Sequence, residues 1–369
     1  MRHIDESRGG GQHRPMMGQG DEGRVMTRAG GQIGLVAALA LVLGTMVGSG
    51  VFLLPATLAP YGWSAMGGWM IAIAGTLALA GCYAALSRQL PGQCGPYAFV
   101  DNAYGPLAGY LAAWSYWTGL WVGNAALSVA VVSNLTVVFP GLATVPGLGP
   151  AASLAVLLLV TLINLSGVRA ASAMQQLTTA IKLVPLLAVL GIAGWLLATQ
   201  GRAVVINPPQ ALEWGAVTTC VTLTMWAFLG FEMATLPADK IRNARFTVPF
   251  ATIAAPALAG LLYMAICAAM LALMPADALA SSNAPFADFA APFLGRQVAA
   301  VIGVIAAISA LGAMNGLTLA AAEMPRALAN SGQFPPRFAA LNQAGAPATA
   351  LWLTCGLAAV LVLMNTNRT

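Results

Sequence analysis

The hydrophobic positions of this chain fall into long runs separated by short polar breaks. Each run is long enough to cross about 30 Å of hydrocarbon as a helix that rises about 1.5 Å per residue. We expect membrane spans at residues 33–59, 64–86, 107–139, 151–168, 177–198, 216–238, 248–274, 298–322 and 347–364. The pattern predicts an all-α polytopic membrane protein, in which the long third span is tilted or extends beyond the bilayer.

Composition narrows the class of protein further. Of the 369 residues, 59% are hydrophobic and only 7% are charged, whereas soluble proteins are about a quarter charged. This excludes a soluble enzyme, a disulfide-rich secreted module and a disordered protein. His3 and His13 both lie near the N-terminus, and the cysteines at positions 82, 94, 220, 267 and 355 lack metal-ligand or redox spacing. We therefore expect no metal site, no cofactor and no enzymatic activity.

The charged residues carry information about topology. Residues 1–30 are rich in glycine and charge and show no apolar period, so we expect a disordered cytoplasmic tail followed by one membrane domain over 31–369. With the N-terminus inside, the short cytoplasmic loops collect most of the Lys and Arg residues, as membrane proteins prefer. This predicts a cytoplasmic N-terminus. We expect a multi-pass protein of the cell inner (plasma) membrane. The net charge of +5 is too thinly spread for a nucleic-acid partner.

The first span contains a Gly-Ser-Gly motif at residues 48–50, with Pro55 beyond it. Each glycine costs a helix about 1 kcal/mol relative to alanine. One interpretation is a helix broken at the bilayer midplane, whose second half points free N–H groups at a carboxylate or other anionic group. The other is close packing of small residues between membrane helices.

The sixth span offers a counterpart to the first. Gly230 stands among bulky residues, and Glu232 lies within the apolar run. Acidic residues inside a membrane are costly and usually functional; the alternative is that Glu232 is solvated at the cytoplasmic end of its span. Interruptions at corresponding places in spans one and six are what two inverted five-helix repeats produce.

Two further positions are candidates for function, each with a plainer alternative. Lys182 is a basic residue inside the fifth span, where a buried amine can lose a proton or take the place of a coupling cation; alternatively, it snorkels to the interface. In the third span, Asn124 could hydrogen-bond a substrate, and Tyr116 and Trp121 could gate a cavity. The alternative for this aromatic cluster is packing or an interfacial belt.

Other classes of membrane protein fit the sequence poorly. A channel needs polar or charged rings lining a pore, and these spans contain few such residues. A membrane-embedded enzyme needs a catalytic set, and the spans contain no histidine, thiol pair or acid pair.

Several motifs together carry a resemblance to a known family. They are Gly48-Ser49-Gly50-Val51-Phe52-Leu53-Leu54-Pro55, the Pro91-Gly92 and Pro96-Tyr97-Ala98 loop, Trp121-Val122-Gly123-Asn124, Trp226-Ala227-Phe228-Leu229-Gly230-Phe231-Glu232, and the Gly-Gln-Phe-Pro-Pro-Arg-Phe stretch at 332–338. From about residue 30 to its end, the chain resembles the amino acid–polyamine–organocation (APC) transporter superfamily. The nearest branch is the basic amino acid/polyamine antiporters, and within it the pattern of arginine/agmatine exchange is closest.

The resemblance implies a fold of five-plus-five inverted repeats with broken helices 1 and 6, and transport by alternating access. It implies a secondary active antiporter that exchanges a basic amino acid such as arginine for its decarboxylated amine, such as agmatine. The alternative is a proton-coupled amino acid permease, a symporter for neutral or broad-range amino acids.

The resemblance also indicates partners. The expected partners are a small-molecule substrate, protons and the lipid bilayer, and a homodimer is one assembly open to the chain. Because the family has about twelve helices and nine spans are expected here, we also expect the chain to be C-terminally incomplete.

Residue roles follow from the resemblance position by position. Those matching the substrate site are Met46, Ser49, Gly50, Gly119, Leu120, Asn124, Leu127, Trp226 and Leu229. Trp226 matches the aromatic residue that stacks on the cationic side chain of the substrate. Tyr116 matches a gate residue, and Glu232 matches an acid at the inner gate that is linked to the pH response.

Two positions depart from the pattern of arginine exchange. Leu317 replaces the eighth-helix aromatic residue that closes on a guanidinium group. A cation–π contact contributes about 0.5–2 kcal/mol, so this change could relax the preference for a cation. Lys182 is similar to the fifth-helix lysine of proton-coupled members, which stands where sodium-coupled relatives hold an ion.

Overall fold

The computed structural model describes residues 33–90, 95–136, 138–282, 284–295 and 297–366. The predicted tail at 1–30 lies outside these ranges. Helices cover every expected span: α2 (Leu35–Met46), α4 (Ser64–Gln89), α6 (Pro106–Leu135), α8 (Leu148–Leu165), α9 (Val168–Gln200), α10 (Trp214–Met225), α11 (Ala244–Leu273), α14 (Val298–Asn330) and α15 (Ala348–Thr366). Short helices connect them: α3 (Leu54–Leu58), α5 (Gly95–Tyr104), α7 (Gly141–Thr144), α12 (Ala276–Ala280) and α13 (Pro285–Leu294).

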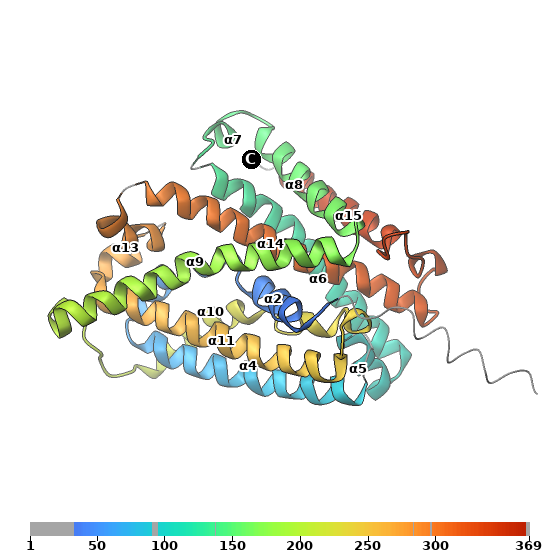
Figure 1. Cartoon of the computed structure of the whole chain (residues 1–369), viewed down its shortest axis with the longest axis horizontal. Coiled ribbons are helices and arrows are strands. Elements are labelled where there is room, and N and C mark those ends of the chain that lie inside the picture. Colours follow the sequence, from blue (N-terminus) through green and yellow to red (C-terminus); the bar gives the residue numbers. More distant parts are fainter. Residues whose placement is uncertain (1–32, 91–94, 137, 283, 296, 367–369) are drawn as a thin grey trace, which may run out of the picture. The chain divides into compact units, whose positions relative to one another are not determined.

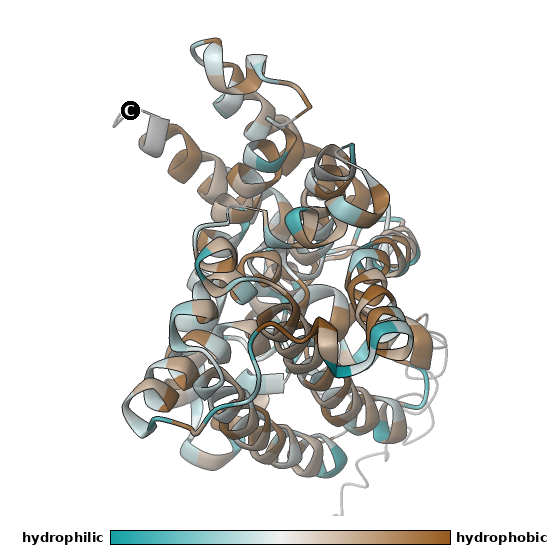
Figure 2. Cartoon of the chain, turned by 90° about the vertical axis from the view of Figure 1, so that its left-hand side faces the viewer, coloured by the Kyte–Doolittle hydropathy of each residue, from teal (hydrophilic) through white to brown (hydrophobic). Residues whose placement is uncertain are grey.

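The helices have the length and apolarity of membrane spans. Within the described residues, 7 helical segments can cross a membrane, when α10 is counted with the turns that follow it to Thr235. Helices α2 and α15 are shorter and also apolar. Hydrophobic residues dominate the helices in Figure 2, as expected where backbone polar groups are paired within helices and side chains meet lipid.

The helices pack in two groups, and their membership follows the repeat. Helices α2, α4, α10 and α11, from spans one, two, six and seven, contact one another. Helices α6, α8, α14 and α15, from spans three, four, eight and nine, form the second group. Each group therefore joins spans that lie five apart in the chain, which is the arrangement that an inverted five-helix repeat predicts. The long helix α9 runs beside α2 and α14 (Figure 1) and contacts both.

Two helix boundaries differ from the predicted ones. Helix α9 begins at Val168, nine residues before the expected span, and α14 continues past 322 to Asn330. Both extensions contain polar residues that hydropathy assigns to loops. Gln175 in α9 and Glu323 in α14 are each 1% exposed; Gln175 is bonded to α14, and Glu323 to Lys240 in a distant loop. Tertiary contacts therefore satisfy groups that would otherwise need water.

Candidate functional site

The first span is interrupted where its glycines predicted a break. Helix α2 ends at Met46, Val47 and Gly48 leave the helical conformation, and a short 3-10 turn, η1, runs over Ser49–Phe52 before α3. The side chain of Ser49 lies outside the described part of the structure. The predicted break of the helix at the Gly-Ser-Gly motif is confirmed.

The sixth span is interrupted in the same way. Helix α10 ends at Met225, a 3-10 turn (η4) covers Trp226–Phe228, and a second turn (η5) covers Met233–Thr235. Between these turns, Gly230 has a φ of 104°, a conformation that favours glycine. A Cβ atom at Gly230 would lie 2.9 Å from Cγ2 of Thr45 on α2. The glycine therefore allows the two broken segments to approach each other.

A cavity of about 670 Å³ lies beside both interruptions. Its wall combines residues next to the first break, residues of the second break and one face of α6, and Ala313 and Leu317 of α14 complete it. Near the break of the first span, a Cβ atom at Gly50 would lie 3.8 Å from the indole Nε1 of Trp226. Trp226 thus reaches from one interruption toward the other, and its side chain is 73% exposed.

Most of the residues predicted for the substrate site line this cavity. They are Met46, Gly50, Tyr116, Gly119, Leu120, Leu127, Trp226, Leu229, Glu232 and Leu317. Asn124 and Trp121 are not among the lining residues. Asn124 is 2% exposed and lies just beyond the edge of the α6 stripe that contains Leu120, Gly123 and Leu127.

The wall also contains residues that we did not predict, including Thr45, Ser115, Gly123, Ala126 and Ala130. Four of them continue the helical period of Tyr116, Gly119 and Leu127 along α6, so the 3.6-residue repeat was a signal that could have found them. Thr45 is adjacent to Met46 in the chain.

Glu232 is the charged residue among the described residues that line the cavity. It is 9% exposed, and the Tyr116 hydroxyl donates a hydrogen bond of 2.6 Å to its Oε1. The alternative of a carboxylate solvated at the end of its span is therefore wrong. The cavity is an apolar chamber with one carboxylate held by a tyrosine from another helix.

Lys182 does not line the cavity. Its side chain is fully buried in α9, and its Nζ donates hydrogen bonds to the carbonyl oxygens of Gly44 (2.6 Å), Val47 (2.7 Å) and Ser309 (3.2 Å). The snorkelling alternative is wrong, because the amine is held among backbone carbonyls. It lies directly behind the first interruption.

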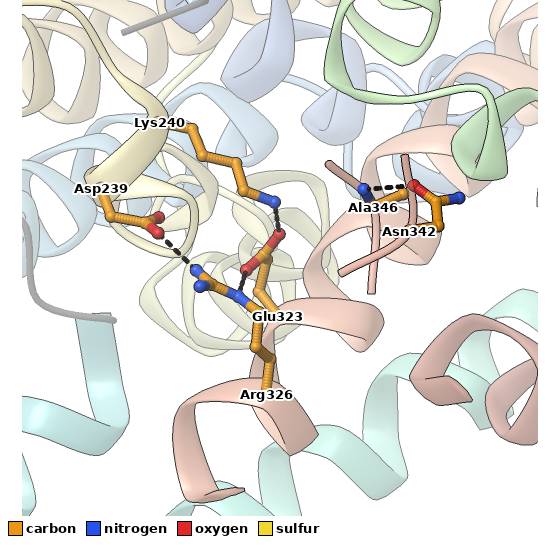
Figure 3. Close-up of polar contacts among 6 residues, drawn as sticks. All are labelled: Asp239, Lys240, Glu323, Arg326, Asn342 and Ala346. Atoms are coloured by element: carbon orange, nitrogen blue, oxygen red, sulfur yellow. Dashed lines mark hydrogen bonds and ion pairs between the residues drawn. The ribbon is translucent and has the colours of Figure 1, made fainter. Parts of the chain in front are cut away.

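A cluster of four charges joins the loop after the second interruption to α14. Lys240 and Arg326 both contact the carboxylate of Glu323, and Arg326 also pairs with Asp239 (Figure 3). The Glu323 side chain is fully buried, whereas that of Asp239 is 38% exposed. Two backbone hydrogen bonds tie Ile33, just before α2, to Lys240 and Arg242. One end of each interrupted span is thus anchored to the same loop.

Comparisons with known proteins agree with this architecture. The family described as "Amino acid permease" matches residues 33–369. The cadaverine/lysine antiporter of Escherichia coli K12 is 31% identical over 339 residues, covering 90% of this chain and 76% of that protein. The putrescine transporter PotE of the same strain is 27% identical over 344 residues, covering 91% and 77%.

A solved structure shows the same fold. The outward-open, substrate-bound structure of a Na+-coupled sialic acid symporter has a TM-score of 0.58 over 92% of this chain and 74% of that chain, at 12% identity. The fold is thus that of transporters with two broken helices. The chain belongs to the amino acid permease family of the APC superfamily, on its basic amino acid/polyamine antiporter side, and is an amino acid transporter rather than an enzyme.

Proposed function

We propose that the chain is a secondary active antiporter that exchanges a basic amino acid for its decarboxylated amine by alternating access. We place it in the inner membrane of a bacterium, with its N-terminus in the cytoplasm. The observation that supports the exchange of cations is Glu232, the carboxylate in the otherwise uncharged wall of the cavity. A single negative charge in a site of low polarity favours a positively charged ligand.

The geometry suggests how a basic amino acid would lie in the cavity. The unwound backbone at Met46 to Gly50 offers peptide groups to the α-carboxylate and α-amine of the substrate. The exposed indole of Trp226 offers a face to the cationic side chain. Gly119, Leu120 and Leu127 of α6, with Leu229 and Leu317, provide an apolar wall for the methylene groups between the two ends. We assign Tyr116 and Glu232 to gating.

The relatives support exchange of this substrate class. One is named for cadaverine and lysine and the other for putrescine. Arginine with agmatine remains within the proposal, as do lysine with cadaverine and ornithine with putrescine. Leu317 occupies the place of a second aromatic residue, so we expect a cavity that accepts the flexible ammonium side chain of lysine at least as well as a guanidinium group.

Vesicle transport tests this proposal. Proteoliposomes are loaded with unlabelled lysine, ornithine, arginine or alanine, and the uptake of each labelled amino acid and of its decarboxylated amine is followed with and without a pH gradient. Antiport predicts uptake only into vesicles that contain a basic amino acid or its amine. Uptake into empty vesicles, driven by the gradient alone, would contradict it.

Proton-coupled symport is a second candidate, favoured by Lys182. Its ammonium group is held by carbonyl oxygens at the back of the first interruption, the kind of oxygen cage that also suits a metal cation. A lysine that gains and loses a proton there would couple substrate binding to the pH gradient. The empty-vesicle arm of the same experiment separates this mechanism from exchange.

A further inference from the structure

A stripe of polar side chains on α9 faces the first half-helix. Gln175, Thr179 and Lys182 recur at intervals of four and three residues, so they share one face of α9. All three are at most 5% exposed. Gln175 Nε2 and Thr179 Oγ1 donate to the carbonyl oxygen of Ala40 at 3.4 and 3.1 Å. Lys182 continues the ladder at Gly44.

Behind this stripe, three side-chain amides from three helices form a directed chain. Asn164 of α8 donates to Oδ1 of Asn315 at 3.0 Å. Asn315 of α14 donates to Oε1 of Gln175 at 2.8 Å, and Gln175 donates to Ala40 of α2. Asn315 thus accepts from Asn164 and donates to Gln175, and Gln175 accepts from Asn315 and donates to the backbone carbonyl of Ala40. Such chains polarise their members and strengthen one another in a site of low dielectric. We call Asn164, Asn315 and Gln175 the amide relay.

Gln175 can approach the backbone of α2 closely because α2 has a glycine, Gly44, at its contact with α9. A Cβ atom at Gly44 would lie 2.0 Å from Gln175 Nε2 and 2.4 Å from Thr179 Oγ1. The amide of Gln175 therefore rests directly on the backbone of α2. A side chain larger than glycine at position 44 would separate the two helices here.

The opposite side of α2 lines the cavity. Ala40, Gly44 and Val47 face the polar stripe, whereas Thr45 and Met46 line the cavity wall. We propose that the amide relay is a positioning device: it holds α2 from behind and thereby sets the geometry of the cavity face at the first interruption. Gln175 and Asn315 are positioning residues, because neither lines the cavity.

This inference rests on the proposed transport function for one of its two readouts. The first readout is the KM and turnover of exchange in proteoliposomes. The second needs no substrate: it is the rate at which a thiol reagent modifies the chain carrying Met46→Cys in an otherwise cysteine-free background. If the wild-type chain carries none of the tested substrates, the proposed function fails while the labelling rate still tests the relay.

The variants separate positioning from packing. Asn315→Leu cuts the relay at its centre and leaves Gln175 Oε1 without that donor. The double variant Gln175→Leu/Asn315→Leu removes both partners of the Asn315–Gln175 bond, so neither of these two amides is left unpaired. Asn164 loses its acceptor on Asn315 but still donates to the carbonyl oxygen of Val160, so folding should suffer less than in Asn315→Leu. Gln176→Leu is the matched control, because Gln176 is the exposed neighbour whose amide donates to the carbonyl oxygen of Ser172 in its own helix.

We expect both relay variants to raise KM and the labelling rate at position 46 by about fivefold, the effect of losing one net hydrogen bond, with turnover changed less than KM. The control should match the wild type in both. A double variant that folds and shows wild-type KM and labelling would overturn the proposal, since the amides would then contribute only to packing. Failure of both relay variants to fold would also count against it, since the relay would then be a requirement for folding.

Discussion

The hydroxyl of Tyr116 on α6 donates a 2.6 Å hydrogen bond to the carboxylate of Glu232, 116 residues away in the chain. The bond connects the second group of helices to the interrupted sixth span across the cavity wall. If the two groups separate during the proposed alternating access, this bond has to break. Glu232 therefore belongs both to the wall of the cavity and to a contact between the two groups of helices.

Removing that charge should remove the pH response of transport. We expect Glu232→Gln, which keeps the shape and can still accept a bond from Tyr116, to flatten the dependence of exchange rate on pH over the range in which the chain stays folded. Tyr116→Phe is the companion variant, because it retains the carboxylate and should retain a pH response. Exchange rates measured in proteoliposomes over that range test this expectation, and an unchanged profile in Glu232→Gln would remove Glu232 from gating.

Trp226 should discriminate between cationic and neutral ligands. A cation–π contact contributes about 0.5–2 kcal/mol, so Trp226→Leu should weaken binding of a basic amino acid by roughly 2- to 30-fold and that of alanine far less. Trp226→Phe keeps a ring and should lose less. Binding isotherms in detergent measure the difference. Equal losses for both ligands would show that the indole contributes only contact area.

Lys182 should be needed for the integrity of the first interruption. Lys182→Met keeps the length of the side chain but leaves the carbonyl of Gly44 without its charged donor, and a hydrogen bond to a charged group is worth about 1.5–3 kcal/mol. We expect a lower unfolding temperature in detergent and slower transport. Gln176→Met, at an exposed position of the same helix, is the control. Wild-type stability and transport in Lys182→Met would mean that the amine is dispensable.

Much of the fold could be predicted from local sequence. The hydropathy of the spans identified every long helix, and Gly48, Gly50 and Gly230 marked both interruptions, because glycine costs a helix and permits the conformations that a break requires. The residues predicted near the breaks, such as Met46, Gly50 and Leu229, line the cavity. Their positions could be predicted because the place of a break along the chain determines which residues border it.

The remaining differences depend on tertiary contacts. Gln175 and Glu323 appeared too polar for helix interiors, and only partners on distant segments, Asn315 and Lys240, explain their burial. Asn124 shows that a matching motif does not by itself place a residue in the cavity wall. Its motif matched the family, but the rotation of α6 places it just past the edge of the cavity, and that rotation is set by packing against neighbouring helices rather than by the motif.

The charge cluster offers a contrast between two carboxylates with different exposure. Removing one member of a buried ion pair costs about 3–5 kcal/mol, whereas an exposed pair is worth about 0–1 kcal/mol. Glu323→Gln should therefore destabilise the chain much more than Asp239→Asn, since the side chains are 0% and 38% exposed. Thermal unfolding of both variants in the same detergent gives the comparison. Similar unfolding temperatures would indicate that water reaches Glu323.

Gly230 provides a test of the close approach between the two interruptions. An alanine there would adopt an unfavourable φ of 104° and place its Cβ 2.9 Å from Cγ2 of Thr45, at a cost of about 1–3 kcal/mol. Because the sixth span would have to move away from α2 to relieve the contact, Gly230→Ala should weaken substrate binding as well as stability. Combining it with Thr45→Ser removes the Cγ2 methyl and should restore part of the binding while the backbone strain remains. If the double variant binds substrate no better than Gly230→Ala, backbone conformation alone accounts for the loss and the contact with Thr45 does not.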